Sequence, residues 1–329
     1  MNKPQNKLFW VGGATGAVYG LSIRGLLQTS IGHGTWVTPV IWVMSIAFIA
    51  VVPFAMGYIT VAMKARHAPV TVTQRIFVPW AAVLISLAVS AAVLWEGVIC
   101  IVMFSPIALV CGSLGGLLAG YAVRPSRPQA ATVSMLIVAL LPMFVGPIEH
   151  HLGTVEARSV ESEVVIQAPA ETVWRNIERV PTIDPTELPR SWNRTIGFPR
   201  PLEATLSYEG LGGVRHATFA GGVLFIETID VWEPLKRLGF SIHADSDHIP
   251  STTLDEHVKV GGRYFDVPHG EYILEPQPGG MVRLRLVSRH RVSTDFNWYA
   301  RLWTDAVMRD VQRSILHVVR NRCEADNRR

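Results

Sequence analysis

Residues 294–323 read TDFNWYARLWTDAVMRDVQRSILHVVRNRC, and this stretch decides the fold of the second half of the 329-residue chain. Its apolar residues recur at spacings of three and four, so they share one face of a long amphipathic helix. That face comprises Tyr299, Leu302, Trp303, Ala306, Val307, Val311, Ile315, Val318 and Val319. A lone helix with several aromatic residues near its start needs a large apolar partner, and we expect that partner to be a sheet.

The segments that precede this helix alternate between apolar and polar residues, which is typical of β-strands. Residues 170–180 interrupt the strands with helical spacing, and glycine pairs such as Gly212-Gly213 and Gly279-Gly280 mark turns between strands. The sequence therefore predicts an α+β domain in the order strand, helix, strands, long helix. The expected strands are residues 160–167, 204–208, 214–220, 223–232, 239–245, 264–274 and 281–293.

One motif carries a family resemblance. Residues 164–177, VVIQAPAETVWRNI, resemble the opening strand, Ala-Pro-Ala-Glu turn and first helix of the START-like superfamily. This group includes polyketide cyclases and dehydrases, plant lipid-binding allergens and lipid-transfer domains. The resemblance covers about residues 158–323 and implies a helix-grip fold, in which an antiparallel sheet wraps round the last helix and encloses an apolar cavity. Because the superfamily shares a cavity rather than a chemistry, the resemblance implies no catalytic residue.

The first half of the chain has a different composition. Apolar residues make up 49% of the sequence and the mean hydropathy is +0.27, with the excess concentrated before residue 150. Residues 1–152 carry eight Lys or Arg and two acidic residues, whereas the rest carries 22 Lys or Arg and 24 acidic residues. The pI near 9.1 thus arises in the apolar half. We therefore expect no nucleic-acid partner, since binding of nucleic acid requires a basic face on a soluble domain.

We expect about five transmembrane helices in residues 1–152 and a helix-grip domain in residues 153–329. A spanning helix needs about 20 mostly apolar residues. No expected span carries a central charge, so a transporter that conducts ions through these helices is weakly supported. The expected spans, which make the lipid bilayer a partner, are residues 8–27, 37–63, 76–95, 98–123 and 132–148.

The short loops between these spans predict the orientation, because Lys and Arg favour the cytoplasmic side. Lys64, Arg66 and Arg75 lie between the second and third spans, and Arg124 and Arg127 lie between the fourth and fifth. With five spans, the N-terminus is cytoplasmic and residues 153–329 are exoplasmic. We expect a multi-pass protein of the plasma (inner) membrane with a periplasm-like C-terminal domain.

Glycines recur every fourth residue in two of the spans, at Gly12, Gly16 and Gly20 and again at Gly112, Gly116 and Gly120. Small residues at this spacing let helices approach closely in lipid. The contacts they serve lie either within one chain or between copies in a homo-oligomer.

Alternation assigns faces to the strands and identifies candidate ligand-binding residues. In residues 281–293 the apolar face carries Ser288 and His290 inward with Val282, Leu284, Leu286 and Val292. In residues 223–231 the inward set is Val223, Phe225, Glu227, Ile229 and Val231. An inward carboxylate is costly unless it is paired or hydrated. Glu227 and His290 are therefore candidates for gripping a polar ligand group or for acid–base work, unless they satisfy each other or line a wet rim.

Five further residues complete the candidate ligand-binding set. Ser288 and Tyr272 offer hydroxyls, although Tyr272 also fits a purely structural role in the core. Phe225, Tyr299 and Trp303 offer apolar surface. The catalytic residues, if the domain is an enzyme, remain unknown.

Several chemistries lack sequence support. No GxGxxG, Walker, GxSxG or HExxH motif is present, so we expect no nucleotide or other cofactor. His243, Asp245 and Asp247 alternate on one strand face, but opposite the apolar face, and Glu149-His150-His151 lies at a span end. We expect neither group to hold a metal.

Three functions follow from this reading. The leading one is a membrane-anchored START-like domain that binds a hydrophobic or lipid-like small molecule. The second is an enzyme of the cyclase or dehydratase kind that uses an acid–base residue in the cavity. The third is a non-catalytic subunit of a membrane complex.

Overall fold

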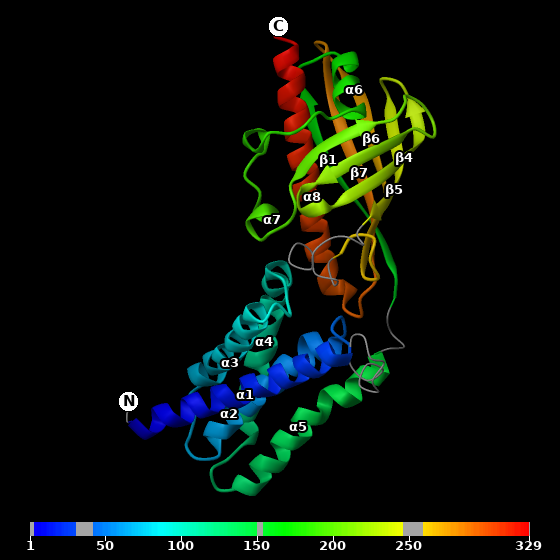
Figure 1. The fold of residues 1–329 in the computed structure, drawn as a ribbon. Helices are drawn as coiled ribbons and strands as arrows, with labels where there is room; N and C mark the ends of the chain where they lie inside the picture. The colour runs from blue at the N-terminus through cyan, green and yellow to red at the C-terminus, as the bar shows by residue number, and fades with distance from the viewer. Residues whose placement is uncertain (1–2, 31–41, 150–153, 246–258, 329) are drawn as a thin grey trace. The chain divides into compact units, whose positions relative to one another are not determined.

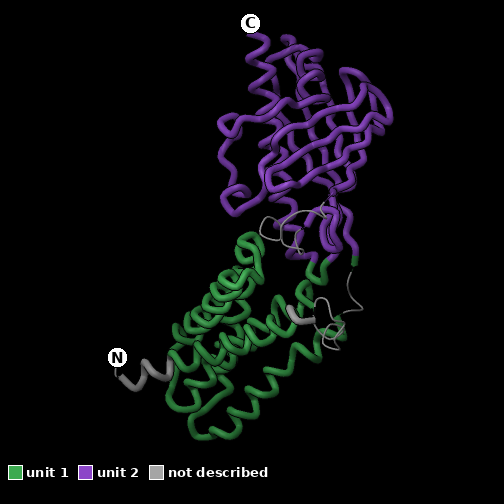
Figure 2. The backbone as a smooth tube through the Cα atoms, viewed as in Figure 1, with its two compact units in different colours: residues 1–154, 294–296 green, residues 155–293, 297–329 purple. Residues whose placement is uncertain are grey.

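The computed structural model describes residues 3–30, 42–149, 154–245 and 259–328. The chain forms two compact units (Figure 2), the first comprising residues 1–154 with 294–296 and the second residues 155–293 with 297–329. His150, His151, Asp247 and the start of the expected 37–63 span lie outside the described residues.

The first unit is helical. Among its described residues, four helical segments are long and apolar enough to cross a membrane: Ala47–Ala65, Val72–Ala92, Val98–Ala122 and Pro128–Glu149. The expected span at residues 8–27 lies within the helix Lys3–Ser30, which is not among these four, so a fifth span stays a prediction. The elements of the unit are α1 (Lys3–Ser30), the π-helical η1 (Ala47–Val51), α2 (Val52–Ala65), α3 (Val72–Ala92), α4 (Val98–Ala122) and α5 (Pro128–Glu149).

Glycines bring these helices close together. A Cβ atom added at Gly57 of α2 would overlap the backbone of Gly112 of α4, and one added at Gly115 would overlap the carbonyl group of Phe54. Gly12 and Gly16 of α1 face α2 in the same way. The glycine stripes therefore make contacts within the chain, and a homo-oligomer through them stays a prediction.

The described part of the second unit forms one antiparallel sheet of seven strands in the order β1-β7-β6-β5-β4-β3-β2, with a long helix, α8, against β1 and β7 (Figure 1). The expected α+β architecture is confirmed, and the sheet and last helix have a helix-grip arrangement. Its elements are β1 (Glu156–Ile166), α6 (Ala170–Glu178), η2 (Pro185–Glu187), α7 (Trp192–Thr195), β2 (Pro201–Leu206), β3 (Val214–Phe219), η3 (Ala220–Gly222), β4 (Leu224–Glu233), β5 (Arg237–Asp245), β6 (Phe265–Gln277), β7 (Met281–Val292) and α8 (Asn297–Asp326).

The core lies between the sheet and the helices α6 and α8. In β7 every second residue from Val282 to Val292 is buried, as the alternation predicts. Trp174 of α6 packs edge-on against Trp232 of β4 with ring centroids 5.1 Å apart. The other buried members include Ile166, Val173, Ile177, Leu238, Phe240, Tyr272, Leu284, Leu316 and Val319.

One strand departs from simple alternation. The β4–β5 register shifts between Ile229 and Val231, which indicates a β-bulge. Beyond it, Trp232 packs against the core, so the expectation that Val231 points inward is wrong. An extra residue in a strand exchanges the two faces after it, and the sequence gives no sign of where this happens.

Candidate functional site

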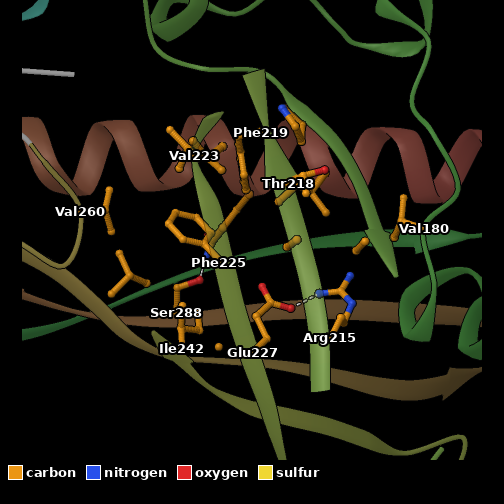
Figure 3. A pocket seen from close by; sticks show the side chains of 18 of the residues that line it. Val180, Arg215, Thr218, Phe219, Val223, Phe225, Glu227, Ile242, Val260 and Ser288 are labelled. Carbon is orange, nitrogen blue, oxygen red and sulfur yellow. Dashed lines mark hydrogen bonds and ion pairs between the residues drawn. The ribbon is translucent and has the colours of Figure 1, made fainter. Parts of the chain in front are cut away.

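A cavity of about 120 Å³ lies inside the second unit (Figure 3). Strands β2 to β7 line one side, α8 lines another through Met308, Val311, Gln312 and Ile315, and Val260 and residues of the 180–199 segment complete the wall. The surface is mostly apolar. Its apolar side chains include Val180, Ile183, Phe219, Phe225, Phe240, Ile242 and Leu286.

The main polar group on this wall is an ion pair. Arg215 of β3 and Glu227 of β4 are directly opposite each other in the strand register, and the Arg215 guanidinium donates a hydrogen bond to the Glu227 carboxylate (Figure 3). Both residues are buried, at 4% and 5% exposure. Arg215 also interacts with the Tyr272 hydroxyl, and its Cζ lies 5.5 Å from the centre of the Phe240 ring. Paired in this way, the carboxylate can lie beside an apolar space.

Burial and charge act against each other in this cluster. Burial raises the pKa of the Glu227 carboxyl, and the Arg215 guanidinium beside it opposes that rise. Burial favours a lower pKa for Arg215, but Glu227 and Tyr272 outweigh it and raise that pKa. Burial also raises the pKa of Tyr272. Because a guanidinium keeps its proton in proteins, the cluster is an Arg215–Glu227 ion pair next to a neutral phenol.

A second polar group lies where α8 meets β1 and β7. Gln312 is 1% exposed, and its Nε2 donates hydrogen bonds to the Val160 carbonyl oxygen at 3.0 Å and to Ser288 Oγ at 2.9 Å. Ser288 and Gln312 both line the cavity. The sequence analysis missed Gln312, although a signal existed: it lies one helical turn from Met308 and Leu316, on the buried stripe of α8.

His290 has a different environment from Glu227. It is 1% exposed and is not among the cavity-lining residues. Its Nε2 lies 3.3 Å from Asp305 Oδ1 of α8, and Arg158 of β1 binds the same carboxylate at 2.9 and 2.7 Å. Burial lowers the pKa of His290. Glu227 and His290 therefore do not pair with each other, since each lies beside its own partner of opposite charge. The contacts of Asp305 with Arg158 and His290 connect α8 to β1 and β7.

The remaining candidate ligand-binding residues fall into two groups, those that line the cavity and those that do not. Phe225 and Tyr272 line the cavity with Glu227 and Ser288. Tyr299 and Trp303 do not line it; Trp303 instead lies 6.3 Å from Trp192 of α7 and 6.4 Å from Tyr299 between ring centroids. The apolar face that the sequence predicts for α8 therefore has two environments: its first turns pack among aromatic side chains, and its middle lines the cavity.

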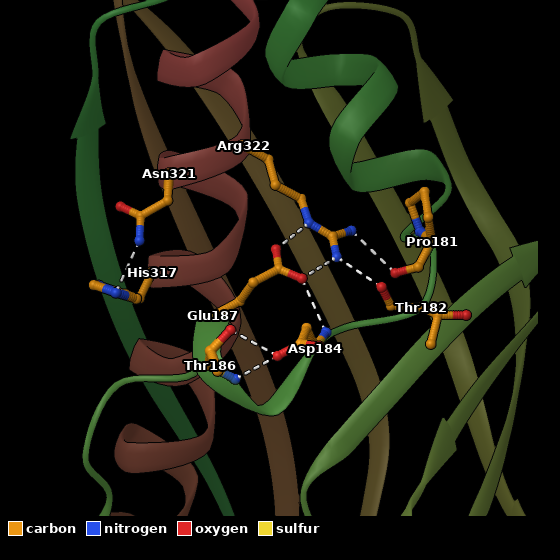
Figure 4. A network of polar contacts seen from close by, with 8 residues as sticks. All are labelled: Pro181, Thr182, Asp184, Thr186, Glu187, His317, Asn321 and Arg322. Carbon is orange, nitrogen blue, oxygen red and sulfur yellow. Dashed lines mark hydrogen bonds and ion pairs between the residues drawn. The ribbon is translucent and has the colours of Figure 1, made fainter.

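One wall of the cavity is fastened to α8 by Arg322 (Figure 4). Its guanidinium binds both carboxylate oxygens of Glu187 at 2.7 and 2.8 Å. It also donates to the carbonyl oxygens of Pro181 and Thr182, each at 3.0 Å. These residues belong to the same segment as the cavity-lining Val180 and Ile183.

No group of three or more His, Cys, Asp or Glu side chains in the described part of the chain is placed to hold a metal ion. His243 is exposed on β5, on the opposite face from the buried Phe240.

Solved structures with a similar fold cover about half of this chain. Neither a protein-family model nor a curated protein matches the chain. Among solved structures, the Zhui aromatase/cyclase from Streptomyces sp. R1128 is 17% identical over 52% of this chain and 96% of its own, with a TM-score of 0.31. Ara h 8.0201 is 11% identical over 52% and 99%, with a TM-score of 0.33. A protein from Thermus thermophilus is 18% identical over 51% and 99%, also with a TM-score of 0.33. The helix-grip description rests on the strand order and on α8 of this chain.

Proposed function

We propose that the second unit is a membrane-anchored binding domain for a small, mainly apolar molecule, which it holds between the sheet and α8. The observation that carries this proposal is the cavity itself, because its wall is largely aliphatic and aromatic and carries few polar side chains. Pockets for small ligands commonly combine an apolar wall with a few polar groups that fix orientation.

The volume of the cavity limits the size of the ligand. An apolar cavity of about 150 Å³ in another protein takes up benzene. The space here, about 120 Å³, suits a single ring or a short chain. A whole lipid would require the walls to move apart, so the proposal is a small apolar molecule or the end of a larger one.

A cyclase or dehydratase function is the second candidate, because Glu227 lies on the cavity wall and burial raises its pKa. A general base must be free to take a proton from the ligand. The carboxylate of Glu227 is instead bound to Arg215, which stabilises its charged form and weakens it as a base. His290, the other candidate base, is not a cavity-lining residue. These features favour binding over proton abstraction.

We further propose that the four apolar helical segments anchor the chain in the plasma membrane with the second unit on the exoplasmic side. The basic loops after α2 and α4 support this orientation, because Lys and Arg favour the cytoplasmic side. With residues 66–71 and 123–127 on that side, α5 would cross outward. Whether α1 also crosses alters only the side of the N-terminus. A fluorescent protein that matures only in the cytoplasm should stay dark when fused at residue 329, and a bright fusion would contradict the orientation.

Binding can be tested with the full chain in lipid nanodiscs. Ala217→Phe places a ring in the cavity, whereas Ala325→Phe adds the same ring at an exposed position of α8. We expect ¹⁹F NMR to show broadening of the 4-fluorotoluene resonance by the wild type and by Ala325→Phe beyond that caused by empty nanodiscs, but not by Ala217→Phe. Equal broadening by all three proteins would contradict the proposal.

A further inference from the structure

The pair Ser288–Gln312 leaves hydrogen-bonding capacity unused next to the cavity. The two N–H groups of the Gln312 amide are occupied by the Val160 carbonyl oxygen and by Ser288 Oγ. Among the described residues, its buried Oε1 has no hydrogen-bond partner. A buried acceptor without a partner is costly, so such a group usually has a compensating ligand or water.

The orientation of the amide is fixed by its neighbours. Val160 presents a carbonyl oxygen, which can only accept, so the nitrogen of Gln312 must face it and Oε1 must face away. Ser288 accepts from Gln312 and keeps its own hydroxyl proton for another group. No acceptor for that proton is found in the described ranges of the chain. The pair therefore offers one acceptor and one donor.

We propose that Ser288 and Gln312 bind a hydroxyl group of the ligand, so that the ligand is an apolar alcohol or phenol. A hydroxyl is the small neutral group that both donates and accepts through one oxygen. It would donate to Gln312 Oε1 and accept from the Ser288 hydroxyl. A carbonyl or ether oxygen could use only the Ser288 donor, and a hydrocarbon could use neither. This inference rests on the proposed binding function and adds the chemical class of the ligand.

The Arg215–Glu227 pair does not compete for this role. Its carboxylate and guanidinium bind each other, and the two residues belong to β3 and β4, whereas the Ser288–Gln312 pair joins β7 to α8. The cavity wall thus has a charged group whose two members bind each other, with Arg215 Nε left without a partner among the described residues, and a neutral group with an unpaired acceptor.

The experiment compares two probes of nearly equal shape, 4-fluorophenol and 4-fluorotoluene, by ¹⁹F NMR on the full chain in nanodiscs, with empty nanodiscs as the reference. We expect the wild type to bind 4-fluorophenol about tenfold more tightly than 4-fluorotoluene after the nanodisc reference is subtracted, which is the effect of one to two neutral hydrogen bonds. In Ser288→Ala and in Gln312→Leu this preference should fall to about twofold or less, while 4-fluorotoluene still binds.

Two results would overturn the inference, and they differ from each other. If the wild type binds both probes equally, or if the preference survives in both variants, the pair holds only water or nothing, and the proposed binding function still stands. If neither probe binds the wild type, the proposed function fails as well. Near-UV circular dichroism of each variant checks that its fold is retained. Ser288→Thr, which keeps the hydroxyl, should preserve the preference for 4-fluorophenol.

Discussion

Arg215 and Glu227 occupy directly opposite positions on β3 and β4, and their side chains form an ion pair that lines the cavity. The pair places charge beside an apolar space, and each charge has a partner of opposite sign.

Removing one member of this pair should destabilise the protein more than removing both. Breaking a buried ion pair costs about 3–5 kcal/mol, because the remaining charge has no partner. We expect Arg215→Met to lower the free energy of unfolding by about that amount, and Arg215→Met combined with Glu227→Leu to recover most of it. Urea unfolding of the full chain in nanodiscs, followed by near-UV circular dichroism, measures both. A double variant no more stable than Arg215→Met would contradict the interpretation.

His290 should make stability depend on pH. Its pKa in the folded protein lies below the ordinary value of 6.5, chiefly because it is buried. As the pH falls below 6.5, the unfolded chain takes up a proton that the folded protein resists, so stability is lost until the pH passes the folded pKa. Nearby Asp305 opposes this effect and Arg158 reinforces it.

Unfolding measured between pH 7 and pH 5 provides the test. In His290→Gln the loss over this range should be smaller than in the wild type, whereas His243→Gln, at an exposed position of β5, should behave as the wild type does. If His290→Gln loses as much stability as the wild type, the histidine is not responsible.

Arg322 should control the mobility of one cavity wall. It binds Glu187, Pro181 and Thr182 from α8, and its side chain is 19% exposed. For a partly exposed pair we expect a local effect of about 1 kcal/mol, which corresponds to roughly fivefold faster amide hydrogen exchange in residues 181–187 of Arg322→Leu. Arg313→Leu, at an exposed position of the same helix, is the control. Unchanged exchange in Arg322→Leu would show that other contacts hold this wall.

The close approach of α2 and α4 depends on glycine. A Cβ atom at Gly115 would overlap the Phe54 carbonyl group, whereas one at Gly13 of α1 would have no atom within 4 Å. Gly115→Ala should therefore lower stability by about 1–3 kcal/mol, the usual cost of overpacking, and Gly13→Ala should not lower it. Thermal unfolding in nanodiscs compares the two, and equal behaviour would mean that α2 and α4 can separate without cost.

The sequence predicted the architecture well because strand and helix periods are local signals. All seven strands and the long helix lie where alternation and spacing place them, and β7 has the predicted buried face. The β4 bulge was not predictable, since it depends on how Trp232 packs against Trp174 from a distant helix. The expected first span lies in a helix that is less apolar than the four that qualify, and a membrane crossing there stays a prediction.

The candidate site was predicted only in part. Inward polar residues were correctly identified at Glu227 and Ser288, because a polar residue on an apolar face is conspicuous. Their partners were missed. Arg215 alternates with the buried Ala217 and Phe219, and Gln312 falls on the buried stripe of α8. Both are therefore polar residues on an apolar face, which is the pattern that identified Glu227 and Ser288. Which buried polar groups meet depends on strand pairing and on the rotation of α8, which one sequence does not specify.

The central claim is that the space between the sheet and α8 accepts an apolar guest. A crystal structure of the full chain soaked with 4-bromotoluene tests it most directly, through the anomalous scattering of bromine. The account predicts a bromine peak among Phe225, Phe240 and Ile315. A structure with no peak there, in which these side chains close the space, would contradict it.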